Sequence, residues 1–317
     1  MAAIELDGVT KRFDDVTAVD GLDLTVEEGE VFGFLGPNGA GKSTTINLLL
    51  DFVRPTAGRV EVLGMDPQAD SVAVRERTGV LPEGFSTYER LTGREHLEFA
   101  IESKNADADP DAVLERVGLA GDGDRKAGGY SKGMAQRLAL GMALVGDPDL
   151  LILDEPSSGL DPAGAKEMRD IVREEADRGA TVFFSSHVLG QVEAVCDSVG
   201  ILREGRLVAK DSVEGLRDAV GSGATLEITA DGVDDAALDA VRALDGVDAA
   251  STDGATVTVQ CDSEAKTAVI GALEDAGVVV EDFSTRESSL EDLFLAYTEG
   301  DTPNDGPDDG AAEEVES

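Results

Sequence analysis

The segment GPNGAGKST, residues 36–44, restricts the fold of this chain more than any other feature. It matches the pattern G-x-x-x-x-G-K-S/T, follows the apolar run EVFGFLG and leads into GKSTTINLLLDFV, which has helical spacing. Its glycines let backbone N–H groups converge on phosphate oxygens, and the N-terminus of the following helix attracts anions. The segment therefore predicts a phosphate-binding loop, in preference to a glycine-rich turn with an incidental lysine.

The residue types in this loop have distinct roles toward a nucleoside triphosphate. Lys42 is expected to bridge the β- and γ-phosphates, and the Ser43 hydroxyl to ligate Mg²⁺. The nucleotide-binding residues that the loop predicts are Gly36, Pro37, Asn38, Gly39, Ala40, Gly41, Lys42, Ser43 and Thr44.

Strand-like and helical segments alternate over residues 1–215, which indicates an α/β fold. The first runs, AIELDGVTKRF and LDLTVEEG, alternate around Gly and Asp turns and predict antiparallel strands. Later runs such as DLLILDEP and ATVFFSSH are separated by helical segments, as in a parallel sheet covered by helices. Between about residues 86 and 145 the pattern is helical throughout, which predicts an inserted helical subdomain.

Two of the later strands end in chemically active side chains. LLILDEP ends in Asp154, which fits a second Mg²⁺ ligand, and Glu155, which fits a general base or a water-orienting group. His187 ends FFSSH, at the strand end where open α/β sheets place ligands, and is expected to contact the γ-phosphate and the attacking water. A solvated turn and a structural histidine are the simpler alternatives. His96, in TGREHLEFA, is assigned a structural role.

Composition excludes several classes of function. The net charge of −40 opposes binding to nucleic acid phosphates, and we interpret it as the surface of a protein from a salt-loving organism. Only Cys196 and Cys261 occur, far apart, so a disulfide framework is not expected and a reducing cytosol is. With two histidines, a His/Cys metal cluster is nearly excluded. No run has the length of a signal peptide core or a membrane span.

Residues 3–215 resemble the ATP-binding subunit of an ABC transporter, a P-loop NTPase. Five segments carry the resemblance in the family's order: GPNGAGKST, YSKGMAQRL, LLILDEP, SSGLDP and SSH. The resemblance implies ATP and Mg²⁺ as cofactors, ATP hydrolysis, and a head-to-tail dimer formed with a second copy or a paralogue. It also implies a separate membrane permease, and hence a position on the cytoplasmic face of the cell membrane.

Further site residues follow from the resemblance alone. YSKGM stands where the family has its signature loop, so Ser131, Lys132 and Gly133 are expected to contact ATP bound by the other subunit, and Asp161 lies in the loop that couples the two sites. Phe13 matches the residue that stacks on adenine, with a core role at a strand end as the alternative.

Glu83 stands where the family usually has a glutamine that ligates Mg²⁺. Its added charge either tightens the metal site or slows closure before the metal arrives, and the sequence does not choose between these effects.

A second unit is expected over residues 222–299, and the segment AVGSGA, residues 219–224, is expected to be the loop that leads into it. Its order of β-α-β-β-α-β segments indicates a small α+β domain with a ferredoxin-like arrangement. The last helix, SSLEDLFLAYT, has Ser288 and Glu291 at capping-box spacing and resembles the ending of export-type relatives. Residues 300–317 are expected to form a disordered acidic tail. This unit has two possible roles: it supports packing or dimerisation, or it binds a regulatory ligand.

The leading hypothesis is thus an ATPase that drives export through a permease. One alternative is a soluble ABC ATPase that acts on DNA or ribosomes, although the acidity and the lack of coiled-coil or zinc insertions oppose it. A nucleotide-binding regulatory module that does not hydrolyse ATP is a third possibility, opposed by Glu155 and His187. Specificity for the exported substrate is expected to lie in the permease.

Overall fold

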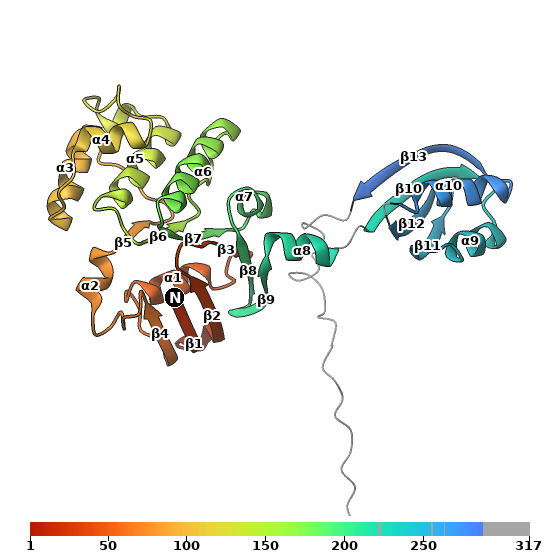
Figure 1. The fold of residues 1–317 in the computed structure, drawn as a ribbon, viewed down its shortest axis with the longest axis horizontal. Helices are drawn as coiled ribbons and strands as arrows, with labels where there is room; N and C mark the ends of the chain where they lie inside the picture. The colour runs from red at the N-terminus through yellow and green to blue at the C-terminus, as the bar shows by residue number, and fades with distance from the viewer. Residues whose placement is uncertain (221–222, 255, 263, 288–317) are drawn as a thin grey trace, which may run out of the picture.

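The computed structural model describes residues 1–220, 223–254, 256–262 and 264–287. It contains two bodies, with helix α8 (Val213–Val220) between them (Figure 1). The helix expected over residues 288–298, with its Ser288–Glu291 capping box, and the tail of residues 300–317 lie outside the described residues. Within the described part of the chain, no helix has the length and apolar character needed to cross a membrane.

A six-stranded sheet organises the first body. Its order is β5-β6-β7-β3-β8-β9, and neighbouring strands run parallel except β8 and β9. The strands are β3 (Val31–Leu35), β5 (Thr78–Leu81), β6 (Leu150–Asp154), β7 (Thr181–Ser186), β8 (Ser198–Arg203) and β9 (Arg206–Ser212). Strands β3, β6 and β7 are buried along their full length, since both faces of this sheet are covered. The predicted α/β fold is therefore confirmed.

A separate antiparallel sheet, in the order β2-β1-β4, packs on one side of the first. It consists of β1 (Ala2–Phe13), β2 (Val16–Glu27) and β4 (Ala57–Val62). Its buried side chains share a core cluster with Phe32, Phe34, Phe183 and the apolar face of α1 (Lys42–Leu49). This shared core holds the loop between β3 and α1 in place.

Helices cover the rest of the first body. They are α2 (Ser71–Glu76), α3 (Gly93–Lys104), α4 (Pro110–Arg116), α5 (Lys132–Leu144), α6 (Pro162–Asp177) and α7 (Leu189–Glu193), with a short 3₁₀ turn at Ala127–Gly129. Helices α3, α4 and α5 group together at the end of the sheet near β5, where the sequence predicts the helical subdomain (Figure 1). A capping box begins α3, because the Thr92 hydroxyl accepts from the Glu95 N–H and the Glu95 carboxylate accepts from the Thr92 N–H. The backbone hydrogen bond from Thr92 lowers the pKa of Glu95.

A buried carboxylate joins the helical subdomain to α6. Glu175 on α6 pairs with Arg116 on α4 and with Arg178. Burial disfavours the Arg116 charge, but the hydrogen bonds to Glu175 and Asp147 outweigh this cost and raise the pKa of the guanidinium. Loss of one partner from such a buried pair costs about 3–5 kcal/mol, so the cluster fixes α4 against α6.

The second body is a four-stranded antiparallel sheet in the order β11-β12-β10-β13. Its elements are β10 (Gly223–Asp231), α9 (Asp235–Arg242), β11 (Val247–Asp253), β12 (Thr256–Asp262), α10 (Lys266–Asp275) and β13 (Val279–Glu287). This order and connectivity agree with the ferredoxin-like arrangement expected from the sequence.

The structure differs from the sequence interpretation at the connection between the bodies. The segment AVGSGA, residues 219–224, was expected to be a loop, but its first residues end α8 and its last residues begin β10. The reason is that Val213 and Leu216, three residues apart, bury one face of a helix.

Candidate functional site

The loop between β3 and α1 has a backbone shape that glycine alone tolerates. Gly41, the residue before α1, has φ 111°, and a Cβ there would lie 2.5 Å from the Ala18 carbonyl oxygen. No side chain among the described residues caps this helix, so its first N–H groups remain available to an anion. The local geometry is therefore that of a phosphate-binding loop.

A pocket of about 330 Å³ lies over this loop and brings together residues from distant segments. Its lining consists of Ala18, Pro37, Asn38, Gly39, Gly41, Lys42, Ser43, Thr44, Glu83, Asp154 and Glu155. Gly36 and Ala40, also expected in the loop, are not among the residues that line this pocket. Ala40 is buried in the core, and the Gly36 carbonyl accepts a hydrogen bond from Lys42.

Lys42 and His187 both contact the carboxylate of Glu155, which lines this pocket together with Lys42, while His187 is not one of the lining residues. The Lys42 ammonium is buried, donates to the Gly36 carbonyl at 2.7 Å and lies 3.7 Å from Glu155 Oε1. His187 Nδ1 lies 2.9 Å from the same carboxylate oxygen. Glu155 Oε2 is buried and has no hydrogen-bond partner among the described residues. One carboxylate oxygen is thus held in place while the other remains available as an acceptor.

The backbone supports this placement of Glu155. Its φ of 50° is rare for a residue with a side chain, and its N–H donates to the Ser185 carbonyl of the adjacent strand β7 at 3.2 Å.

Asp154, Ser43 and Glu83 supply oxygen atoms at the same pocket. The buried Asp154 carboxylate accepts a hydrogen bond from the Ser185 hydroxyl. No cluster of three or more His, Cys, Asp or Glu among the described residues is arranged to hold a metal ion by itself. One hydroxyl with one or two carboxylates nevertheless fits Mg²⁺, which completes its shell with phosphate oxygens and water.

The YSKGM loop and the loop before α6 form a second pocket, of about 380 Å³. Ser131 caps α5 by accepting from the Met134 N–H, and Asp161 caps α6 by accepting from the Gly164 N–H. Two helix N-termini therefore meet beside Lys132. The Lys132 ammonium packs against Gly159, since a Cβ at Gly159 would lie 1.9 Å from its Nζ.

Phe13 lies outside the residues that line the nucleotide pocket. It ends β1 with 43% of its surface exposed, and Lys11 Nζ lies 4.7 Å from its ring centre. The exposed ring rules out the alternative of a core residue and leaves it accessible at the β1–β2 turn.

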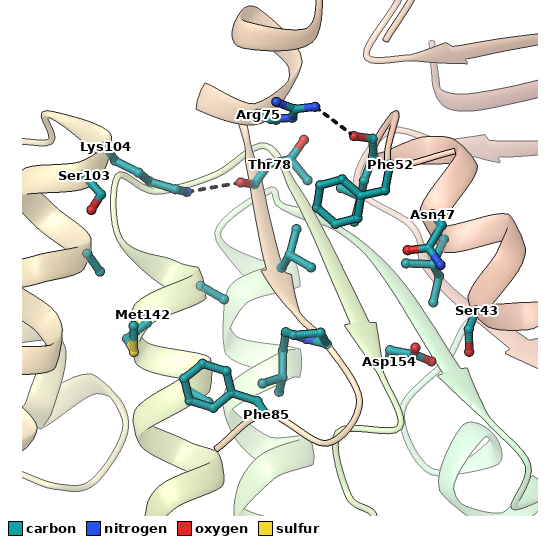
Figure 2. Close-up of a pocket in the computed structure, with 18 of the residues that line it drawn as sticks. Ser43, Asn47, Phe52, Arg75, Thr78, Phe85, Ser103, Lys104, Met142 and Asp154 are labelled. Atoms are coloured by element: carbon teal, nitrogen blue, oxygen red, sulfur yellow. Dashed lines mark hydrogen bonds between the residues drawn. The ribbon is translucent and has the colours of Figure 1, made fainter. Parts of the chain in front are cut away.

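An apolar groove adjoins the nucleotide pocket and opens toward the helical subdomain (Figure 2). It has a volume of about 470 Å³ and shares Ser43 and Asp154 with that pocket. Phe85 and Met142 lie along it, and the Lys104 ammonium donates to the Thr78 carbonyl of β5 (Figure 2). Burial lowers the pKa of Lys104. This groove was not anticipated from the sequence, because its lining comes from segments that are far apart along the chain.

Comparison with known proteins identifies the family. A profile described as "ABC transporter" matches residues 19–158. The daunorubicin resistance ATP-binding protein DrrA3 of Streptomyces coeruleorubidus is 37% identical over 308 residues, which cover 94% of this chain and 96% of that protein. The chain belongs to the ABC transporter ATP-binding proteins.

Other relatives place this ABC ATP-binding subunit in the drug-exporter subfamily. The bacitracin transport ATP-binding protein BcrA of Bacillus licheniformis is 42% identical over 211 residues, or 65% of this chain and 68% of that protein. A solved ATP-binding subunit of an ABC transporter has a TM-score of 0.62 and 28% identity, covering 69% of this chain and 93% of that one. The subunit is thus an ATPase of an ABC exporter, and its family implies a permease partner.

Proposed function

We propose that two ATP-binding subunits of this type close head to tail around two ATP molecules, and that closing and reopening drive export through the permease. One observation carries the proposal. The phosphate-binding pocket and the pocket at YSKGM have no lining residue in common, although the family uses both segments toward one nucleotide. A second subunit that brings its YSKGM loop to the first pocket would complete the site.

Within one subunit, the phosphate-binding loop and Lys42 would hold the β- and γ-phosphates. Glu155 Oε2 would accept a proton from the attacking water, while His187 and Lys42 hold the other carboxylate oxygen in place. Mg²⁺, held by Ser43, Asp154 and Glu83 together with the phosphates, would neutralise charge that develops on the phosphate oxygens. Phe13, exposed at its turn, would stack on the adenine.

The opposite subunit would contribute Ser131, Lys132, Gly133 and Asp161. The N-terminus of α5 would present backbone N–H groups to the γ-phosphate. Lys132 would bring a positive charge to the same phosphate when the dimer closes. Asp161 caps α6 and would hold the neighbouring loop in the shape that meets the first subunit.

The apolar groove is where we place the permease contact. It shares Ser43 and Asp154 with the nucleotide pocket, so a shift of these residues on ATP binding would reach a partner seated there. Exposed rings on its wall, Phe52 at 65% and Phe99 at 59%, offer apolar surface to that partner. Such a contact would hold the subunit at the cytoplasmic face of the membrane. The named relatives act in daunorubicin resistance and bacitracin transport, so we infer a drug-like exported substrate.

Mixing two inactive variants tests the shared site. Lys42→Ala disables the phosphate-binding loop, and Gly133→Asp places a carboxylate against the phosphate in the opposite half. The second change is compatible with the fold, because a Cβ at Gly133 meets no atom closer than Ser131 Oγ at 4.0 Å. Each variant alone should show no phosphate release. A 1:1 mixture should recover up to about a quarter of wild-type activity, since half of randomly formed dimers hold one intact site of two.

Two controls accompany this mixture. Circular dichroism should show both variants folded, and Gly133→Asp should still bind ATP through its intact loop. A mixture without activity under these conditions would contradict a site shared between two copies of this chain.

The net charge of −40 leads to a prediction about salt. Raising KCl from 0.2 M to 2 M shortens the screening length to a few ångströms and should raise the melting temperature by roughly 10 °C or more. Calorimetry measures this shift, and an equal osmolality of sucrose separates charge screening from solute exclusion. An unchanged or lower melting temperature in KCl would contradict the inference of a salt-adapted surface.

A further inference from the structure

His96 uses both nitrogens of its ring to hold the loop that follows Glu83. It lies on the first turn of α3 and is 1% exposed. The Tyr88 N–H donates to Nε2 at 2.9 Å, and Nδ1 lies 2.7 Å from the Thr92 carbonyl oxygen. Because a carbonyl oxygen only accepts and a backbone N–H only donates, Nδ1 donates to the Thr92 carbonyl and Nε2 accepts from the Tyr88 N–H. The Tyr88 ring also stacks on the imidazole, with 6.0 Å between the ring centres.

The loop held in this way also supports the segment that leads into YSKGM. The Glu89 carbonyl accepts from the Gly128 N–H at 3.1 Å, and the Leu91 carbonyl accepts from the Ala127 N–H at 2.8 Å. Residues 89–91, just beyond Tyr88, are therefore joined by backbone hydrogen bonds to the turn before Tyr130.

The N-terminus of α3 contacts the YSKGM loop directly as well. The Tyr130 hydroxyl donates to the Asp122 carbonyl at 2.7 Å. A Cβ at Gly93, the first residue of α3, would lie 2.2 Å from that hydroxyl oxygen. Only a glycine at this position leaves room for the Tyr130 side chain. The N-terminal end of α3 thus holds the loop from Glu83 through His96 and packs against the first residue of YSKGM through Gly93.

We propose that His96 is a positioning residue for the half-site that this subunit presents to its partner's ATP. By holding Tyr88 against α3, it keeps residues 89–91 against the turn Ala127–Gly129, which lies just before Tyr130 and Ser131. It thereby links Glu83, in the subunit's own nucleotide pocket, to the loop that closes on the other nucleotide. This role rests on the proposed function, because it needs two subunits that share each ATP.

The test separates ATP binding from dimer closure. In full-length protein that also carries Glu155→Gln, His96→Phe keeps a ring beside Tyr88 but leaves the Tyr88 N–H and the Thr92 carbonyl without the imidazole. ATP affinity, measured with a fluorescent ATP analogue, should stay within about twofold, because the phosphate-binding loop is untouched. The protein concentration needed for ATP-dependent dimerisation, measured by light scattering, should rise about tenfold. Hydrogen exchange should quicken at the amides of Tyr88, Ala127 and Gly128.

Three further variants make the outcome specific to His96 and its contacts. His96→Gln carries both a donor and an acceptor, and should restore much of the dimerisation and amide protection. Gly93→Ala should displace the Tyr130 hydroxyl and weaken dimerisation by disturbing the contact of α3 with YSKGM directly. This variant keeps the test valid if His96→Phe does not fold. Asp109→Ala removes the cap of α4 in the same subdomain, and should lower the melting temperature without changing dimerisation.

The experiment distinguishes failure of the proposed function from failure of the positioning role of His96. If the Glu155→Gln parent with native His96 stays monomeric in ATP, the proposed function fails. If the parent dimerises, and folded His96→Phe and Gly93→Ala dimerise at the same concentration as the parent, the positioning role is overturned and the proposed function stands.

Discussion

Replacing Glu155 by Gln is expected to stop turnover and to hold the subunit as an ATP-bound dimer. The amide keeps an oxygen that can accept from His187, as Oε1 does now at 2.9 Å. It cannot take a proton from water, which is the role proposed for the unpartnered Oε2. ATP therefore binds and closes the site, but the step that would reopen it does not occur.

The size of the effect follows from the role of a general base, whose loss reduces rates by about 10²–10⁴-fold. Phosphate release should fall by that factor, and light scattering should show a doubled mass with ATP and Mg²⁺ but not with ADP. Glu174→Gln is the matched control, because it removes the same charge from an exposed position on α6. Its turnover should stay at the wild-type level.

Two results would contradict this account. A Glu155→Gln variant that remains monomeric with saturating ATP would count against the two-subunit site. A variant with near-normal phosphate release would remove Glu155 from the role of base, and would direct attention to His187 as the group that orients the water.

The parts of the site that could be predicted from sequence lie within short contiguous segments. The glycines of GPNGAGKST allow the backbone conformation that the phosphate-binding loop needs. The apolar strand LLILD places Asp154 and Glu155 at the carboxyl edge of the sheet. The strand containing FFSS ends at the same edge, so His187 reaches Glu155 from the next strand over. In a parallel sheet, the carboxyl ends of adjacent strands lie at the same edge, so residues that directly follow two neighbouring strands are expected to lie close together.

The parts that could not be predicted depend on contacts between segments without a motif. From the sequence, His96 was assigned a structural role without a named partner. That partner is the backbone N–H of Tyr88, a donor that any residue except proline would supply, so no side chain in the sequence indicates the contact. Its link to YSKGM passes through backbone carbonyls as well. The apolar groove likewise forms only when α1, β5 and α3 come together. Neither feature leaves a pattern of residue types in the sequence.

Replacing Lys42 by Ala is expected to remove most of the affinity for ATP. The buried ammonium donates to the Gly36 carbonyl at 2.7 Å and lies 3.4 Å from the Pro37 carbonyl oxygen, so it is held at the phosphate-binding loop before nucleotide arrives. Its charge-assisted hydrogen bonds to phosphate contribute about 1.5–3 kcal/mol each. Loss of two such bonds weakens binding by about a hundredfold or more, which calorimetric titration with ATP measures.

The same change also alters Glu155, and the control must separate the two effects. Without the ammonium 3.7 Å away, the buried Glu155 carboxylate loses its lysine partner and keeps only the contact with His187 Nδ1, so the folded state should lose some stability. Thermal melting of the variant shows whether lost binding reflects lost structure. Lys166→Ala removes an equal charge from the exposed pair with Asp170, and should leave ATP affinity unchanged. If folded Lys42→Ala protein bound ATP as tightly as this control, the phosphates would have to lie elsewhere than over residues 36–44.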